Sequence, residues 1–249
     1  MPLPTSPWLS CPTPNSQARL RMFCFPYAGG AAQIYRHWSV ALPPVVEVCA
    51  IELPGHGRRI AEPPMTQLAQ LVDHLGTTLL SGLNQPFIFF GHSLGALIAF
   101  ELTRWLRSRQ LPLPDLLVVS AARAPHLALT EPPLHQLPKA DFLTELNRYG
   151  GTPQTVIQND ELMELLLPTL RADFALLETY RYQAQALLSC AIAAIGSKQD
   201  AIVSLDEVKS WQTHTAAKFS LDEISGDHFF VHQPQLLPLI ASKLEHLVR

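Results

Sequence analysis

The chain has 249 residues, of which 47% are hydrophobic and 16% are charged, and its formal net charge is −3. This composition is typical of a globular domain with a sizeable core, and it excludes a disordered chain. A charge so close to zero gives no reason to expect nucleic acid or a membrane surface as a partner. Because the sequence shows neither a signal-peptide pattern nor an apolar run of the ~20 residues that span a bilayer, we expect a cytoplasmic protein.

The four cysteines show no C-x-x-C spacing, and three of them lie in apolar, strand-like runs. Cysteines in such runs are usually buried free thiols, so we expect neither disulfides nor a metal site. They are Cys11, Cys24, Cys49 and Cys190.

Short apolar runs bounded by turn residues recur along the chain, and each is typical of a strand buried on both faces. Segments with helical spacing of apolar residues lie between them. This alternation predicts a mainly parallel, doubly wound α/β sheet with helices on both faces. The strands are expected at 19–26, 45–51, 86–90, 115–121, 188–195 and 217–224, and the helices around Trp38 and at 66–81, 94–109, 204–212 and 235–248.

Two segments depart from this alternation. Residues 1–18 are rich in Pro and Ser and are expected to form an irregular N-terminal arm, which Trp8 and Leu9 attach to the body. Residues 123–186 contain no convincing strand, so we interpret them as a helical lid inserted at the carboxyl edge of the sheet, within one domain of residues 1–249. Because Pro168 is not expected inside a long helix, the predicted lid helices are 139–148, 159–167 and 168–183.

A Gly-x-Ser-x-Gly motif directly follows the apolar run at 86–90 and precedes a good helix pattern. A strand that passes into a helix within so few residues needs a sharp turn, for which Gly91 and Gly95 leave room. This turn presents the Ser93 hydroxyl at the carboxyl end of the strand and places the Leu94 amide at the helix N-terminus. The motif therefore predicts a nucleophilic serine, and the alternative is a structural serine in a tight turn.

A serine nucleophile needs a base to accept its proton and an acid to orient that base. In doubly wound hydrolases these residues follow the serine in the order Asp or Glu, then His. Asp200 comes just after the strand at 188–195, and His228 comes just after the strand at 217–224. We therefore predict that Ser93, Asp200 and His228 form a catalytic triad.

Other residues compete for the roles of base and acid. His92 adjoins the serine, but consecutive side chains at a strand end point to opposite faces. His232 leads into the last helix, and Asp227 and Asp206 are more typical of turn or cap residues. All four remain alternatives at this stage.

The anion of a tetrahedral intermediate needs a second backbone amide besides that of Leu94. The glycine-containing turn after the first strand, residues 27–30, can supply it. Ala28 is our first choice and Tyr27 the second, and the alternative is a plain strand-to-helix turn.

In these motifs and in several further stretches, the chain resembles the type II thioesterases, the stand-alone editing enzymes of polyketide and nonribosomal peptide assembly lines. The likeness covers nearly the whole chain in order, and it is most specific in the lid. His56 is a mild departure, since relatives often have Arg there. The matching stretches are residues 23–30, 53–59, 90–96, 150–153, 170–174, 178–180, 196–200 and 226–230.

The resemblance implies an α/β-hydrolase fold and a substrate class, namely acyl or aminoacyl thioesters on the phosphopantetheine arm of an acyl or peptidyl carrier protein. It implies that the enzyme clears misprimed or stalled units and needs no metal or bound cofactor. Separately, we expect a monomer. His228 would activate Ser93, while the Leu94 and Ala28 amides would hold the oxyanion. Free histidine titrates near ~6.5, so activity is expected to fall in acid.

Two alternatives remain open. The same scaffold could serve a medium-chain fatty acyl thioesterase or a small-molecule carboxylesterase. From a different class, it could be a non-catalytic hydrolase fold that acts as a binding module, against which the complete Ser, Asp and His set argues.

Overall fold

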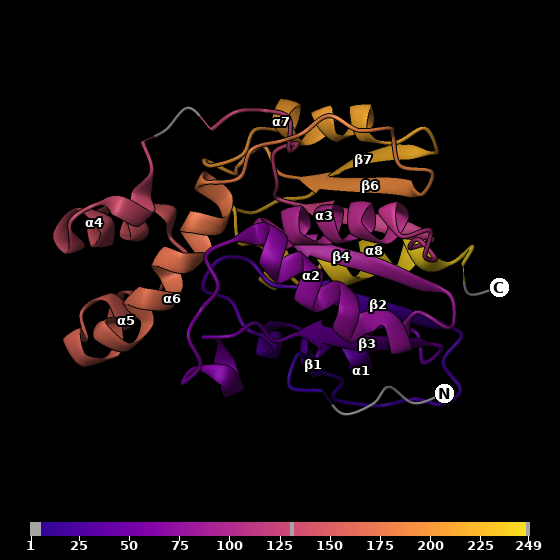
Figure 1. Cartoon of the computed structure of the whole chain (residues 1–249), viewed down its shortest axis with the longest axis horizontal. Helices are drawn as coiled ribbons and strands as arrows, with labels where there is room; N and C mark the ends of the chain where they lie inside the picture. The colour runs from indigo at the N-terminus through magenta and orange to yellow at the C-terminus, as the bar shows by residue number, and fades with distance from the viewer. Residues whose placement is uncertain (1–5, 130–131, 248–249) are drawn as a thin grey trace.

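The computed structural model describes residues 6–129 and 132–247. In this part of the chain a seven-stranded sheet has the order β1-β3-β2-β4-β5-β6-β7, and every pair is parallel except β1 with β3 (Figure 1). The prediction of a mainly parallel sheet is thus confirmed. The strands are β1 (Leu9–Ser10), β2 (Leu20–Phe25), β3 (Val46–Ile51), β4 (Phe87–His92), β5 (Leu116–Ser120), β6 (Ala191–Gly196) and β7 (Phe219–Glu223).

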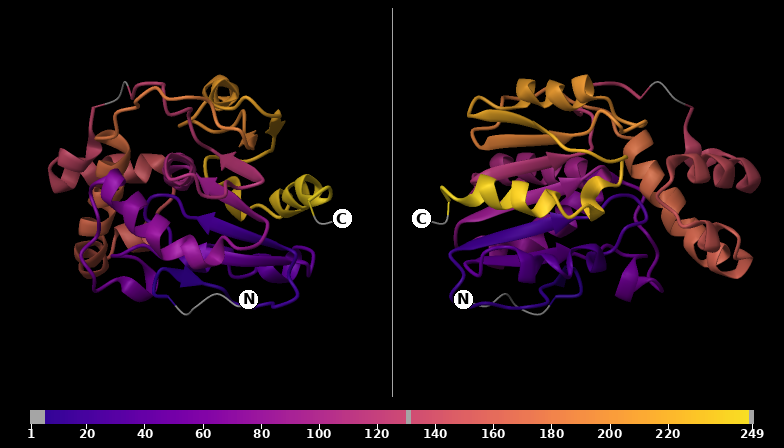
Figure 2. Two further views of the ribbon diagram at one scale, coloured as in Figure 1. Left: turned by 45° about the vertical axis from the view of Figure 1, so that its right-hand side comes forward. Right: turned by 180° about the vertical axis from the view of Figure 1, so that it is seen from behind.

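Helices cover both faces of the sheet and bury two separate cores. On one face, α2, α3 and α7 pack over alternate strand residues such as Phe23 and Phe89. On the other, α1 and α8 pack over the intervening residues such as Met22 and Phe90, and Figure 2 shows α8 crossing this face. The helices outside the lid are α1 (Trp38–Ala41), α2 (Leu68–Leu79), α3 (Leu94–Ser108), α7 (Leu205–Lys209) and α8 (Leu236–Leu244).

The lid lies between β5 and β6 and extends beyond one end of the sheet (Figure 1). It has a small core of its own, in which Phe142 of α4 packs edge-on against Phe174 of α6. The insertion predicted at 123–186 corresponds to this region, and its helices occupy residues 134–178. They are a 3₁₀ turn (Leu134–Gln136), α4 (Lys139–Tyr149), α5 (Gln154–Ile157) and α6 (Asp160–Glu178).

The prediction of two helices separated at Pro168 is wrong, because α6 runs through this proline without a break. A proline inside a helix removes one hydrogen bond and costs about 3 kcal/mol. Here Pro168 lacks the N–H that would donate to the Glu164 carbonyl. Both residues lie on the exposed side of α6, where water can donate to that carbonyl instead. Met163 and Leu170, on the other side, are buried in the lid core and hold the helix together.

The helix also ends earlier than predicted, at Glu178, and an extended segment leads back to β6. Two arginines of α3 bind the carbonyls of this segment. Arg104 donates to the Gln183 carbonyl at 2.5 Å, and Arg107 donates to the Leu187 carbonyl at 3.2 Å. The arginines donate the hydrogen bonds that these carbonyls would otherwise receive in a helix. The periodicity of the sequence does not show such contacts, so the helix was predicted to continue.

The N-terminal arm is less irregular than predicted, although residues 1–5 lie outside the described part. Leu9–Ser10 forms β1, which pairs with the edge strand β3. Trp8 attaches the arm as expected, since its carbonyl accepts from the Glu52 amide at 2.9 Å and its ring lies under Arg59. A free edge strand attracts partners, and the arm covers this one.

All four cysteines are free thiols in the structure, and three of them are buried, as expected. In the described residues, no helix combines the length and the apolar character that crossing a membrane would require.

Candidate active site

Ser93 occupies the sharp turn between β4 and α3, with φ of 53° and ψ of −116°. A positive φ at a residue other than glycine is strained, typically by ~1–3 kcal/mol, and such strain gathers at functional sites. Both glycines of the motif are needed for this geometry. A Cβ on Gly91 would lie 2.2 Å from the Gly95 carbonyl oxygen, and one on Gly95 would lie 2.1 Å from the Phe25 carbonyl oxygen.

Three side chains from separate loops meet at this turn. His228, in the loop after β7, has its Nε2 3.0 Å from the Ser93 hydroxyl oxygen. Its Nδ1 lies 2.8 Å from Oδ2 of Asp200, which is in the loop after β6. The structure therefore brings together the three residues that the sequence singled out, at hydrogen-bond distances suited to proton transfer.

The Asp200 carboxylate is held from both sides. Its Oδ1 accepts from the Ile202 amide at 2.8 Å and the Val203 amide at 3.0 Å, while Oδ2 faces His228. Burial by itself raises the pKa of Asp200, but the His228 imidazole and the two amides outweigh it, so this pKa lies below its ordinary value. Asp200 is thus ionised at neutral pH and keeps the Nδ1 proton of His228 in place.

His92, the nearest rival for the role of base, instead supports the backbone of His228. Its ring is fully buried, its Nε2 donates to the His228 carbonyl at 2.8 Å, and its Nδ1 faces the Ser120 hydroxyl at 2.9 Å. Burial, together with His228, lowers the pKa of His92 to about 3. The ring is therefore neutral, and both of its nitrogens are occupied away from Ser93.

The other rivals also have separate partners. His232 lies 2.9 Å from the Tyr27 hydroxyl, and Asp227 accepts the Phe229 amide at 2.9 Å in a local turn. Asp206 lies in the first turn of α7. None of these contacts involves Ser93.

The turn at residues 27–30 lies beside the N-terminus of α3, because Gly95 packs against the Phe25 and Pro26 carbonyls. Two of its amides are occupied, since Gly30 donates to the Tyr27 carbonyl at 2.8 Å and Gly29 donates to Asp173 at 2.6 Å. Across residues 6–129 and 132–247, no protein acceptor faces the amides of Leu94, Ala28 or Tyr27. Leu94 with either Ala28 or Tyr27 can therefore serve a developing anion, and both choices stay open.

A family model for the thioesterase domain matches residues 20–247. The chain belongs to the thioesterase family. The resemblance inferred from the motifs is thereby confirmed.

Two relatives of this thioesterase match it over most of their length. The linear gramicidin dehydrogenase LgrE of Brevibacillus parabrevis is 42% identical over 245 residues, 96% of this chain and 93% of the relative. The thioesterase PikA5 of Streptomyces venezuelae is 39% identical over 222 residues, 89% of this chain and 78% of the relative. The structure of the type II thioesterase BorB from the borrelidin biosynthetic cluster has a TM-score of 0.87 at 34% identity, and covers 97% of this chain and 99% of that chain. The α/β-hydrolase fold is therefore confirmed.

The lid of the thioesterase contacts the catalytic loop directly. Gly151 lies so close to the Phe229 ring that a Cβ there would be 2.1 Å from it. Phe229 follows His228 in the chain, and its ring also packs edge-on against Tyr27 at 5.1 Å. The lid thus reaches the loop that carries His228 through the contact of Gly151 with Phe229.

Sequence analysis missed the roles of His92 and Asp173. Asp173 was noted only as part of a lid motif, yet it is buried and bonds to the turn at 27–30. The available signal was a carboxylate on the apolar side of a lid helix, since such a group is almost never fully buried without a partner.

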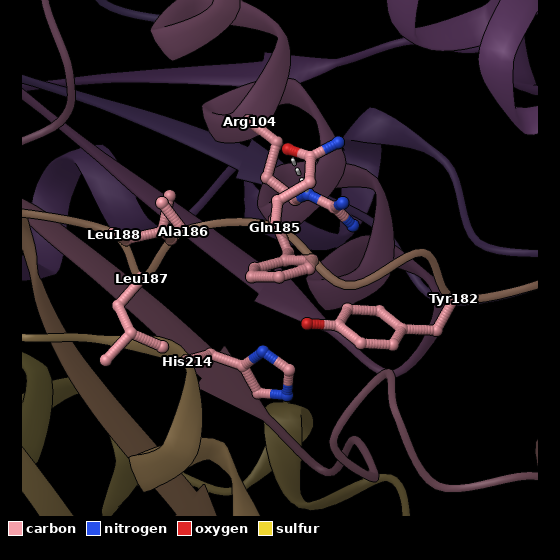
Figure 3. A pocket seen from close by; sticks show the side chains of 8 residues that line it. Arg104, Tyr182, Gln185, Ala186, Leu187, Leu188 and His214 are labelled. Carbon is pink, nitrogen blue, oxygen red and sulfur yellow. Dashed lines mark hydrogen bonds between the residues drawn. The ribbon is translucent and has the colours of Figure 1, made fainter.

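Two hollows on the thioesterase lie along α3 and not at Ser93. One is a groove of about 500 Å³ between α2, α3 and the segment at 179–185. The other is small, and Figure 3 shows Tyr182 and His214 facing it beside the hydrogen bond between Arg104 and Gln185. Within the described residues, no three His, Cys, Asp or Glu side chains are grouped as a metal site would require.

Proposed function

We propose that this thioesterase hydrolyses acyl and aminoacyl thioesters on the phosphopantetheine arm of carrier proteins, and so clears misprimed or stalled units from polyketide or nonribosomal peptide assembly lines. The observation that carries the proposal is the hydrogen-bonded line from Ser93 through His228 to Asp200 beneath a lid. The near full-length likeness to PikA5 and BorB supports this choice of substrate.

In the proposed mechanism, Nε2 of His228 accepts the Ser93 proton as Oγ attacks the thioester carbonyl carbon. The resulting oxyanion accepts hydrogen bonds from the amides of Leu94 and Ala28. The carbon–sulfur bond then breaks, and His228 returns the proton to the leaving pantetheine thiol. His228 next deprotonates a water molecule, which attacks the acyl-enzyme ester. As the bond between the acyl carbon and Ser93 Oγ breaks, His228 returns this proton to Oγ, and the free acid leaves. Every step uses protein groups and water, so we propose that no metal or bound cofactor takes part.

The proposal is tested with one set of acyl and aminoacyl groups presented in two ways. Each group is loaded onto an acyl or peptidyl carrier protein and is also offered as a simple aryl ester. We expect a clearly higher kcat/KM on the carriers, with short acyl and aminoacyl groups accepted. A preference for the aryl esters would instead identify a carboxylesterase, and a strong preference for medium-chain acyl groups would identify a fatty acyl thioesterase.

A further inference from the structure

Asp173 lies in the middle of the lid helix α6, and only 1% of it is exposed. Its Oδ2 accepts two hydrogen bonds from two different loops. One comes from the Gly29 amide at 2.6 Å, and the other comes from Nε2 of His56 at 2.8 Å. A single buried oxygen therefore joins the lid to the turn after β2 and to the loop after β3.

The turn after β2 is a type II turn. The Gly30 amide donates to the Tyr27 carbonyl, and Gly29 has a φ of 77°, as the third residue of such a turn requires. The amide that Asp173 holds belongs to the central peptide of this turn, between Ala28 and Gly29. The Ala28 amide lies in the preceding peptide, and the two peptides meet at the Ala28 Cα. Holding the central peptide therefore limits the directions in which the Ala28 N–H can point.

His56 holds the Asp173 carboxylate in place. Its Nε2 faces Asp173, and its Nδ1 lies 3.0 Å from the Pro54 carbonyl. Both ring nitrogens therefore face acceptors, which suits the charged ring, in which each nitrogen has a proton to donate. Burial by itself lowers the pKa of His56, but Asp173, the Pro54 carbonyl and Glu52 outweigh it and raise this pKa above its ordinary value. A buried carboxylate is stable when it is paired in this way.

A second contact of α6 is separate from the turn at 27–30. Thr169, one helical turn before Asp173, donates its hydroxyl to the Gly55 carbonyl at 2.9 Å. It attaches the lid helix to the loop after β3 without contacting Gly29. Thr169 therefore provides a matched control for Asp173, since it is buried on the same side of the same helix.

We propose that Asp173 is a positioning residue for the oxyanion hole, which fixes the Ala28 amide only when the lid helix is seated on the sheet edge. This inference rests on the proposed function, because it assumes that the Ala28 amide stabilises the oxyanion. It makes the lid a part of the catalytic apparatus as well as a cover. Asp173 does not contact Ser93, His228 or Asp200. The hydrogen bonds among these three residues are therefore expected to persist when the Asp173 carboxylate is removed.

The test compares Asp173→Ala with Thr169→Val in two assays. The first measures kcat and KM on an acyl-loaded carrier. The second measures the rate at which a fluorophosphonate labels Ser93, because its phosphoryl oxygen takes the place of the oxyanion. For Asp173→Ala we expect kcat and the labelling rate to fall by about tenfold to a hundredfold, as for a misplaced oxyanion donor, with little change in KM. For Thr169→Val we expect both to stay close to wild type.

Asp173→Asn is the conservative variant, since its amide oxygen can still accept from Gly29, and it should recover most of the labelling rate. If Asp173→Ala does not fold, the double variant Asp173→Leu with His56→Phe leaves no buried charge behind, and it should show the same loss. The inference would be overturned if kcat and the labelling rate fell equally in Asp173→Ala and Thr169→Val. It would also be overturned if a folded Asp173→Ala, or the double variant in its place, kept the wild-type values. If wild-type enzyme is labelled but does not hydrolyse carrier thioesters, the substrate proposal fails while the labelling comparison still tests Asp173.

Discussion

The sheet edge and the lid are built in different ways. Ser93, Asp200 and His228 follow β4, β6 and β7 of one sheet, and this sheet packs between two large cores. The lid has only a small core of its own, and polar contacts such as those of Asp173 and Thr169 join it to the sheet. The comparison teaches that the turn at Ser93 is supported by large apolar cores, while the contact of the turn at 27–30 with the lid depends on a few buried polar groups.

The largest expected effect comes from removing the nucleophile at the sheet edge. Ser93→Ala should lower kcat on a carrier-bound thioester by about 10⁴-fold or more, because it removes the hydroxyl that faces His228 Nε2 at 3.0 Å. Turnover by the purified variant checks this, with its melting temperature as the control. Substantial remaining turnover would show that the reaction does not pass through Ser93.

Removing the charge behind His228 should have a somewhat smaller effect. Asp200→Asn keeps the size of the side chain but no longer holds the Nδ1 proton, so we expect kcat to fall by about 10³–10⁴-fold. The measurement is kcat and KM at several pH values. Asp227→Asn is the matched control and should remain near wild type, because the Asp227 side chain accepts a turn amide that an Asn oxygen can also accept.

A third prediction compares the cores of the two regions. Phe89→Ala, in the sheet, should lower the free energy of unfolding of the whole domain by about 3–5 kcal/mol. Phe142→Ala, in the lid, removes a ring of the same size but should mainly increase hydrogen exchange and proteolysis within residues 134–178, with a smaller change in the melting temperature. Equal global destabilisation by both variants would mean that lid and sheet unfold as one unit.

The smallest expected effect concerns the pH dependence of the contact between lid and sheet. The pKa of His56 is raised in the folded state, so its pairing stabilises the fold fully below the unfolded value near ~6.5. That contribution is lost as the pH rises through the folded pKa. The charged groups that raise this pKa are Asp173 from α6 and Glu52 after β3.

Urea unfolding of wild type and His56→Gln at a series of pH values measures this contribution. The difference between the two proteins should be largest at acidic pH and should shrink as the pH rises. A difference that is constant across the series would mean that folding does not raise the pKa of the His56 ring.

Much of the candidate site followed from local patterns. The strand, the Gly-x-Ser-x-Gly motif and the helix are contiguous, so the turn at Ser93 depends mainly on neighbouring residues, and Gly91 and Gly95 are small because backbone lies against them. Asp200 and His228 were found from their places after strands, since the carboxyl ends of parallel strands meet at one edge. Their role in catalysis remains a prediction that the substitutions above test.

The sequence by itself determined the order of strands and helices, the serine turn and the family, because periodicity, glycine positions and motifs act over a few residues. Only the tertiary structure decided that α6 continues through Pro168, that His92 supports the His228 carbonyl and that Asp173 bonds to Gly29. The last two contacts join residues 136 and 144 positions apart. Such buried polar pairs arise from the packing of whole elements, and no local pattern states which donor a buried acceptor will meet.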